Sequence, residues 1–171
     1  MIEGTIDVWR KTSGRLLKTP SKFHYSFNIR ELSRVFQGII RVVQQGYDYK
    51  VIQSCSNLKG KVSQALFLVG LWRHECMRTF NDKLTNNDDK NIFKGILEKS
   101  TRDKFRDFQF KDLNFDEDML MTDYLFADFQ RDDVLDENGD FLESAPFVYE
   151  ACQSLEAIRN RTYEKLEKYN E

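Results

Sequence analysis

Apolar residues recur along this chain at the spacing of a helix with one buried face, and this pattern predicts most of its elements. The first helix is expected at about residues 2–17. The Thr19-Pro20 pair ends it, because a proline cannot continue a helix. Residues 22–27 then alternate loosely between polar and apolar side chains, which indicates an extended segment.

A second helix is expected directly after Asn28. Asn28 is a favourable N-cap residue, and Glu31 three residues later gives an approximate capping box. The helix is expected to continue to Gly46, since glycine commonly follows the last helical turn. Its apolar stripe is formed by Ile29, Leu32, Val35 or Phe36, Ile39 and Val43.

A long third helix is predicted from about Lys61 to Leu84, after a polar loop at 47–59. Its stripe consists of Val62, Ala65 or Leu66, Val69, Trp72, Cys76, Phe80 and Leu84. The run at 86–89 then supplies a helix stop, a new N-cap and acidic residues for the next first turn. A shorter fourth helix is expected to end near Ser100.

The following segment is acidic and also aromatic. Residues 112–143 hold twelve acidic residues and one basic residue, Arg131, together with several Phe, Leu and Met side chains. Acidic tails that stay unfolded lack such apolar residues, so we expect this segment to dock through them. The Asn138-Gly139 pair predicts a turn. A charged helix is predicted after Pro146, and because its pattern runs to Glu171 the sequence is expected to be a piece of a larger protein.

The composition supports an all-α fold. The 171 residues include fourteen Phe but only two Pro and eight Gly, which suits long helices. We therefore expect a helical bundle at residues 1–105, followed at 106–171 by an irregular acidic connecting segment and a C-terminal helix. Residues 1–100 carry a net charge of +8 and residues 101–171 one of −10, so the two parts face differently charged surroundings or attract each other.

The sequence predicts neither a membrane protein nor a secreted one. No apolar run approaches the roughly 18 residues that a membrane span requires. The N-terminus lacks the basic and apolar regions of a signal peptide. Three widely spaced cysteines, Cys55, Cys76 and Cys152, indicate a reducing, cytosolic compartment.

Motifs for nucleotide hydrolysis and metal binding were tested against their spacing. Around Gly60-Lys61 a phosphate loop would need a hydroxyl where Val62 stands and a glycine where Cys55 stands, so no enzymatic activity is expected of this chain alone. In the calcium-like run 136–147, Phe141 and Phe147 replace the required glycine and glutamate. No metal site is therefore expected in this run.

The remaining candidate chemistry is equally weak. His74 and Cys76 point to different sides of a helix and cannot share a zinc ion, so His74 and His24 are interpreted as packing or surface residues. The basic residues are scattered over four helices rather than gathered with aromatic residues, so nucleic-acid binding is not expected.

Two arginines at the start of the second helix remain. Arg30 and Arg34 share a face, and they lie where the helix dipole already places positive charge. One interpretation is a surface pair that acids such as Glu31 neutralise. The other is an anion site, where a helix N-terminus and a guanidinium group meet phosphate oxygens. Composition alone does not decide between them.

Two stretches of the sequence resemble dynein heavy chains, particularly the axonemal ones. They are TPSKFHYSFNIRELSRVFQGI at 19–39 and LWRHECMRTFNDKL at 71–84. In dyneins the similar region is the C-terminal helical lid of the third AAA+ module in the motor ring. The tail from about Asp123 to Glu171 is similar to the lead-in to the fourth module. Lys18 departs from the family, which often has proline there, and this puts only the end of the first helix in doubt.

The resemblance implies a function and a site. It implies an AAA+ lid subdomain in an ATP-driven, minus-end-directed microtubule motor of the axoneme of cilia and flagella. By its place in the motif, Arg30 matches the sensor-2 arginine that approaches the γ-phosphate, with Arg34 as the fallback. ATP or ADP with magnesium is then expected in the intact parent protein, and no cofactor in the isolated fragment.

The resemblance also implies partners. These are the neighbouring AAA+ modules of the same chain and, through the parent, the microtubule and the dynein light and intermediate chains. No nucleic acid and no membrane is expected. The alternative from the residues alone is a free-standing helical module that binds another protein and has no catalytic role.

Overall fold

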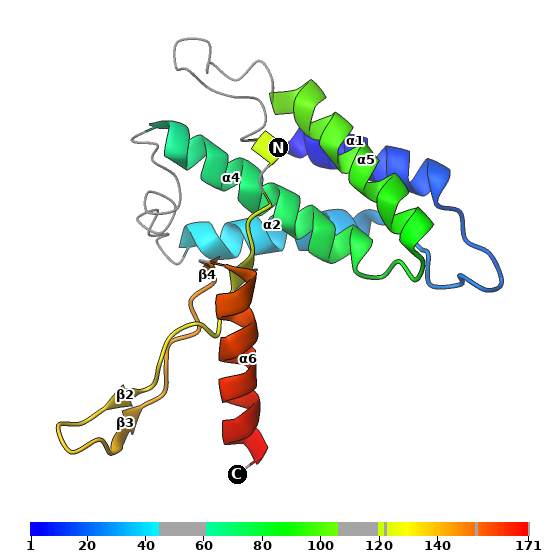
Figure 1. Ribbon diagram of the computed structural model, residues 1–171. Helices are drawn as coiled ribbons and strands as arrows, with labels where there is room; N and C mark the ends of the chain where they lie inside the picture. Colours follow the sequence, from blue (N-terminus) through cyan, green and yellow to red (C-terminus); the bar gives the residue numbers. More distant parts are fainter. Residues whose placement is uncertain (45–60, 106–119, 122, 153, 171) are drawn as a thin grey trace.

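A computed structural model describes residues 1–44, 61–105, 120–121, 123–152 and 154–170 (Figure 1). The predicted loop at 47–59, with Gly46 and Cys55, lies outside these residues, as does most of the acidic stretch at 112–119. The described chain forms a helical bundle with an arm that projects from it. None of the described helices is both long and apolar enough to cross a membrane.

The bundle consists of helices that follow the predicted order. They are α1 (Ile2–Arg15), α2 (Ile29–Gln44), α4 (Lys61–Cys76), a π-helical turn η1 (Met77–Asn81) that continues α4, and α5 (Asn87–Phe105). The all-α prediction is confirmed for this bundle. In Figure 1 α1 lies beside α5, while α2 lies beside α4.

Three helix ends differ from the prediction. The third predicted helix ends with η1 at Asn81, before the predicted Leu84. α1 ends at Arg15, before the predicted Leu17. α5 continues past Ser100 to Phe105, because Thr101 and Phe105 are buried in the bundle and Phe105 packs against Trp72 with 4.9 Å between the ring centres. Tertiary packing, which the local pattern does not reveal, extends this helix.

The central helix α4 is buried on more than the one predicted face. The predicted stripe residues Trp72 and Cys76 are fully buried, but so are Leu71 and Glu75 on other faces of the helix. The last turn, η1, is π-helical, and the Asp82 N–H closes it on the Met77 carbonyl at 3.2 Å. The sequence therefore predicts where this helix lies but understates how deeply it is buried.

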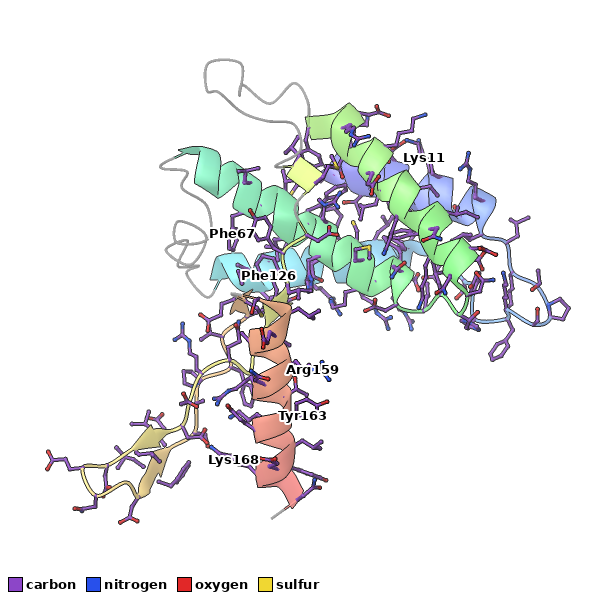
Figure 2. The ribbon with its side chains drawn as sticks, in the orientation of Figure 1. Lys11, Phe67, Phe126, Arg159, Tyr163 and Lys168 are labelled. Atoms are coloured by element: carbon purple, nitrogen blue, oxygen red, sulfur yellow. The ribbon has the colours of Figure 1, made fainter. Side chains whose placement is uncertain are left out.

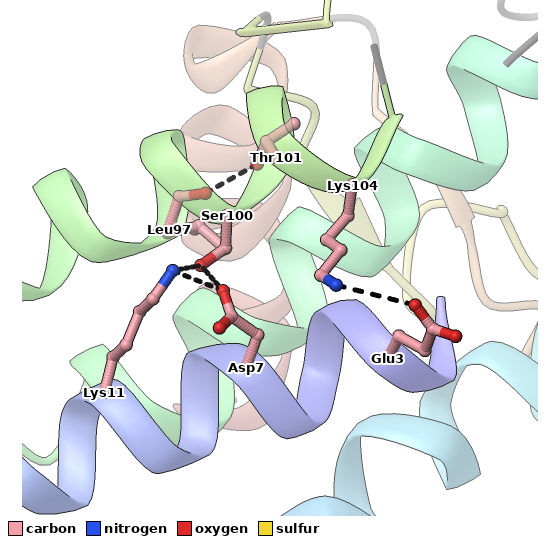
Figure 3. Close-up of polar contacts among 7 residues, drawn as sticks. All are labelled: Glu3, Asp7, Lys11, Leu97, Ser100, Thr101 and Lys104. Atoms are coloured by element: carbon pink, nitrogen blue, oxygen red, sulfur yellow. Dashed lines mark hydrogen bonds and ion pairs between the residues drawn. The ribbon is translucent and has the colours of Figure 1, made fainter. Parts of the chain in front are cut away.

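Polar contacts fix α1 against α5 in antiparallel orientation (Figure 3). Asp7 accepts hydrogen bonds from Lys11 at 2.5 Å and from Ser100 at 2.6 Å, and Lys104 forms an ion pair with Glu3 at 3.5 Å. Burial opposes the ionised form of Asp7, but the bonds from Lys11 and Ser100 outweigh it and lower the pKa of this carboxyl. The start of α1 is thereby held against the end of α5.

The arm begins at a short strand pair on the bundle. Strands β1 (Phe126–Ala127) and β4 (Glu150–Ala151) pair antiparallel, and we call this pair, with Tyr149, the arm junction. Beyond it a second antiparallel pair, β2 (Val134–Leu135) and β3 (Phe141–Glu143), forms a hairpin. Helix α6 (Leu155–Asn170) completes the arm, and the C-terminus lies at its far end (Figure 1). The short strands are an addition that the sequence pattern did not predict.

The prediction of a docked acidic segment is confirmed only in part. Phe126 is buried and packs edge-on against Phe67 of α4 with 5.5 Å between the ring centres (Figure 2). In contrast, Phe141 and Leu142 of the hairpin are 65% and 66% exposed, so docking does not extend along the whole segment. The predicted turn is confirmed, since Gly139 has a φ of 88°, a conformation that glycine adopts at little cost.

Candidate functional site

The start of α2 carries the predicted capping box. The Asn28 side-chain oxygen accepts the Arg30 backbone N–H at 3.0 Å, and Glu31 Oε2 accepts the Asn28 N–H at 2.9 Å. Both bonds satisfy backbone donors that a helix N-terminus leaves free. The orientation of the first helical turn is therefore fixed by its own residues.

Glu31 is also tied to the turn that follows η1. It is buried and forms an ion pair with Lys83 at 3.3 Å, while Lys83 donates to the Ser26 carbonyl at 2.8 Å. Burial opposes the charged form of Glu31, but the Asn28 N–H and Lys83 outweigh it and lower its pKa. Burial lowers the pKa of Lys83, although Glu31 counteracts the shift. Glu31 therefore binds both the backbone of the α2 N-terminus and Lys83.

The lead-in before α2 forms turns at residues 20–24, where the sequence pattern predicted an extended segment at 22–27. It is held by two other helices. Trp9 of α1 donates its indole N–H to the Phe27 carbonyl at 2.9 Å. Asp89, in the first turn of α5, accepts the Tyr25 hydroxyl at 2.8 Å and the Lys22 ammonium at 2.5 Å. Together with Lys83, these contacts fix the α2 N-terminus to α1, to α5 and to the turn after η1.

Acid is expected to weaken the attachment at Asp89. The hydrogen bond from Lys22 lowers the pKa of this carboxyl against the opposing effect of burial, and Tyr25 adds to the lowering. A carboxyl with a lowered pKa stabilises the fold above its ordinary pKa of about 4, and this contribution is lost as the pH falls through the lowered value. We expect the free energy of unfolding of Asp89→Asn to fall less at acid pH than that of the natural chain. Urea unfolding at several pH values measures this difference.

The matched control is Asp88→Asn on the same helical turn, because Asp88 is exposed. This variant is expected to keep the pH dependence of the natural chain. Identical pH profiles for the two variants would show that Asp89 does not stabilise the lead-in.

Arg30 and Arg34 remain available at this fixed helix start. Both side chains are exposed, and neither forms an ion pair or a side-chain hydrogen bond with another residue in the described part of the chain. Glu31 forms no ion pair with either of them and is bound to Asn28 and Lys83 instead. Arg34 lies near enough to Lys83 to oppose its charged form. Within the described ranges, neither arginine therefore has a carboxylate as an ion-pair partner.

The motif at 71–76 also contains two buried charged residues, which join the bundle to the segment leading to the arm. Arg73, only 3% exposed, donates to Asp123 at 2.6 Å and to Thr101 of α5 at 3.2 Å. It also reaches the Met121 carbonyl at 3.4 Å. A single guanidinium group thus connects α4 and α5 with Met121 and Asp123.

Glu75 connects helix α4 to the arm junction. Its side chain is fully buried and accepts the Tyr149 hydroxyl at 2.5 Å and Arg78 at 2.6 Å. Its carboxylate lies against Gly38 of α2, where an added Cβ would come within 2.1 Å of it. Burial raises the pKa of Tyr149, and the bond to Glu75 raises it further. Glu75 therefore joins α2, α4 and the arm junction at one point.

The arm is braced beyond this point by Arg161 of α6. Arg161 donates to the backbone carbonyls of Phe129 and Arg131 and forms an ion pair with Asp132 at 2.6 Å. The side chain of Gln130 donates to the Glu150 carbonyl at 2.9 Å. These bonds connect α6 to the junction, so a displacement of the junction also moves the helix.

The histidines and cysteines have packing roles among the described residues. His74 lies between Phe126 and Tyr149, with ring centres 5.3 and 6.3 Å away, and burial lowers its pKa. Cys76 and Cys152 are buried free thiols. Burial raises the pKa of Cys76 well above its ordinary range and that of Cys152 to about 12, so neither is a ready nucleophile.

Sequence reasoning missed the role of Arg73 and Glu75. The signal was present, since both charged residues stand inside a helix whose neighbouring positions are almost all apolar. Charged side chains are seldom fully buried unless they are paired. Their presence in such a helix indicates buried ion pairs, although their partners are distant in sequence and could not be named.

Comparison with known proteins defines the class of this helical bundle. Residues 1–115 match the family model of the AAA+ lid domain, so the chain belongs to the AAA+ lid domain family. This match covers all the described helices of the bundle, α2 with its capping box included. It confirms the prediction of an AAA+ lid subdomain.

Dynein heavy chains are similar to this chain in sequence. Over 98% of its length the chain is 34% identical to the dynein gamma chain of the flagellar outer arm of Chlamydomonas reinhardtii, and it spans 4% of that protein. Over the same share it is 33% identical to dynein axonemal heavy chain 2 of Mus musculus, of which it spans 3%. It is 36% identical over 60% of its length to dynein axonemal heavy chain 1 of Rattus norvegicus, of which it spans 2%. The resemblance to axonemal dyneins is therefore confirmed.

Proposed function

We propose that this chain is the lid of the third AAA+ module of an axonemal dynein heavy chain, with the segment that leads into the fourth module. The support is the lid match over residues 1–115 together with dynein relatives over nearly the whole chain. Residues 1–105 form the lid in this proposal, and residues 106–171 form the connection. The parent is then an ATP-driven motor on microtubules of the axoneme, with light and intermediate chains as further partners.

The proposed role of the lid is to sense nucleotide through Arg30, with Arg34 as the fallback. Exposed guanidinium groups at a helix N-terminus, with no ion-pair partner among the residues that the structure describes, suit a phosphate group. In the parent, bound ATP with magnesium supplies a terminal phosphate that ADP lacks. The phosphate loop and magnesium ligands belong to sequence outside this chain, which has no hydrolytic activity of its own in this proposal.

The contacts around Arg30 favour sensing by the whole lid. The guanidinium group extends from a helical turn that Asn28 and Glu31 cap and that Lys83 holds to the rest of the bundle. A flexible support would let the side chain alone follow an anion. A fixed support instead makes the free energy of the contact depend on the angle of the lid, so the nucleotide state biases that angle.

The angle is passed on through the arm junction. Arg73 and Glu75 are buried in helix α4. Arg73 binds Asp123, which precedes the arm, and Glu75 binds Tyr149 of the arm junction. Arg161 then binds α6 to Phe129 and Asp132, which follow strand β1 of the junction. This arrangement supports transmission of lid movement to the next module.

Nucleotide affinity and turnover test the role of Arg30. The suitable protein is the parent fragment extended upstream to include the phosphate loop of the third module, because the lid alone holds only part of the site. We expect Arg30→Ala to weaken ATP binding by about tenfold or more and ADP binding far less, since one charge-assisted hydrogen bond contributes about 1.5–3 kcal/mol.

The control variant is Arg102→Ala, which removes an exposed arginine of α5 and is expected to leave both affinities unchanged. Unchanged affinity and turnover in Arg30→Ala would remove this residue from the sensing role. The same loss in Arg34→Ala alone would transfer the role to Arg34.

The exposed arm favours one alternative function. The hairpin and α6 present large apolar side chains, including Phe141, Leu166 and Tyr169, which a free-standing interaction module would use to bind another protein. The reading frame of the gene distinguishes the two proposals. A frame that continues at both ends, with Gly-Lys-Ser/Thr loops on either side, supports the dynein lid, and a frame confined to these residues supports the alternative.

A further inference from the structure

A groove lies between the second half of α1 and the middle of α5. In Figure 1 these two helices lie on the side of the bundle away from the arm. The groove has a volume of about 550 Å³. The two helices run antiparallel, because the start of α1 is bonded to the end of α5 (Figure 3). The groove therefore lies toward the end of α1, away from the Glu3–Lys104 ion pair.

The rim of the groove is basic. Arg10, Arg15 and Lys99 line it, and all three are exposed. None of the three forms an ion pair with a carboxylate in the described part of the chain. Lys11 also lines it, but its charge is already balanced by Asp7. Three unbalanced positive charges thus surround one groove.

The floor of the groove is apolar and open. Ile92, 39% exposed, and the more buried Ile96 form it, together with Gly14 and Gly95. A Cβ added to either glycine would meet no other atom within 4 Å. No packing within the described chain therefore requires Gly95, although a glycine inside a helix costs about 1 kcal/mol relative to alanine. The missing side chains leave room for another backbone.

We propose that this groove is a docking site for an acidic amphipathic helix from outside this chain. An apolar side chain of that helix would contact Ile92, while its carboxylates would pair with Arg10, Arg15 and Lys99. A helix fits because two antiparallel helices form the walls, and because residues three and four apart on the ligand can carry both kinds of side chain on one face. This inference does not depend on the nucleotide-sensing role of Arg30.

A small anion fits the groove less well. The three cations share the groove with Ile92 and Ile96, and most of its exposed lining surface is carbon. A helical ligand uses the floor and the rim together. Charge complementarity therefore selects an acidic helix over an isolated phosphate.

Fluorescence anisotropy with a synthetic helix tests the proposal on the full 171-residue chain. The probe is a labelled peptide of Glu, Ala and Leu with the leucines three and four residues apart, and its control has Gln in place of every Glu. We expect the Glu peptide to bind at least about tenfold more tightly than the Gln peptide, and its binding to weaken as salt is added.

Two kinds of variant locate the binding. The double variant Arg10→Ala/Lys99→Ala is expected to lower the affinity for the Glu peptide about tenfold. The control Lys94→Ala/Arg102→Ala removes the same charge from exposed positions outside the groove and is expected to change this affinity little. Gly95→Leu fills the floor and is expected to abolish binding. Gly95→Ala, with circular dichroism spectra of both variants, checks that the fold survives.

Three results would overturn the proposal. These are equal affinity for the Glu and Gln peptides, equal losses in the two double variants, and undiminished binding by a folded Gly95→Leu variant. Displacement of the peptide by inorganic triphosphate at an equal molar concentration would identify a general anion site and would also overturn the choice of a helix.

Discussion

Replacing Glu75 with glutamine is expected to lower the free energy of unfolding by about 3 kcal/mol and to release the arm from the bundle. The carboxylate is fully buried and accepts hydrogen bonds from both Tyr149 and Arg78. A buried charged hydrogen bond contributes about 1.5–3 kcal/mol, and removing the charge also leaves Arg78 without its partner. The bond to Arg78 contributes less to this loss of stability, because the Arg78 side chain is 48% exposed and water screens its charge.

Two measurements separate the parts of this prediction. Urea unfolding followed by circular dichroism measures the loss of stability. Limited proteolysis under native conditions measures the release of the arm, because the Cys152 N–H then no longer holds its bond to the Leu125 carbonyl. Proteolysis is expected to increase between residues 128 and 152, while the bundle stays resistant.

A matched variant isolates the effect of burial. Glu98→Gln removes an exposed glutamate from α5 and is expected to change stability by less than about 0.5 kcal/mol. Equal stability and equal proteolysis for Glu75→Gln and the natural chain would mean that Glu75 does not anchor the arm, and the proposed transmission path would lose its main contact.

Replacing Trp72 with alanine is expected to have the largest effect on stability, a loss of about 4 kcal/mol. Trp72 is fully buried and packs against Phe105, while its ring lies 3.2 Å from the position of a Cβ added to Gly4. It also donates its indole N–H to the Thr5 hydroxyl at 2.8 Å. The side chain thus contacts α1 and α5 from α4, and its removal leaves a cavity among all three helices.

The variant Trp72→Phe divides this cost into two parts. It keeps most of the apolar ring but loses the hydrogen bond to Thr5, so we expect a loss of about 1–2 kcal/mol. Thr5 keeps its own bond to the Met1 carbonyl at 3.0 Å, which limits the effect. Urea unfolding monitored by circular dichroism measures both variants. A loss below about 1 kcal/mol for Trp72→Ala would contradict the central place of this side chain.

The sequence predicted those elements whose local signals agree with their packing. The capping box of Asn28 and Glu31 appears as expected, because both side chains act on backbone groups within one turn. The turn at Asn138-Gly139 appears for the same reason. Local chemistry determines such features, so a single sequence is sufficient to find them.

Other features depend on contacts between distant residues. α5 extends to Phe105 because Trp72, far away in sequence, packs on it. Arg73 and Glu75 are buried because Asp123 and Tyr149 come from a segment about fifty and seventy residues later. The β1–β4 pair joins two strands too short to have a pattern of their own. No periodicity along the chain encodes these pairings.

The candidate site lies between these two cases. The sequence located Arg30 and Arg34 on one face of a helix start, and their exposure follows from the same pattern. It did not predict that Glu31 would also pair with Lys83, because Lys83 lies on another element. That contact leaves the arginines without the neighbouring acid as a partner. The sensing role itself stays a prediction.

The orientation of one side chain tests the central claim most directly. The measurement is a structure of the parent ring with ATP or a non-hydrolysable analogue in the third module, and a second structure with ADP. Our account predicts that the Arg30 guanidinium lies within hydrogen-bonding distance of the terminal phosphate in the first structure and loses this contact in the second. A guanidinium group directed away from the nucleotide in both structures, paired with a carboxylate of a neighbouring segment, would contradict it.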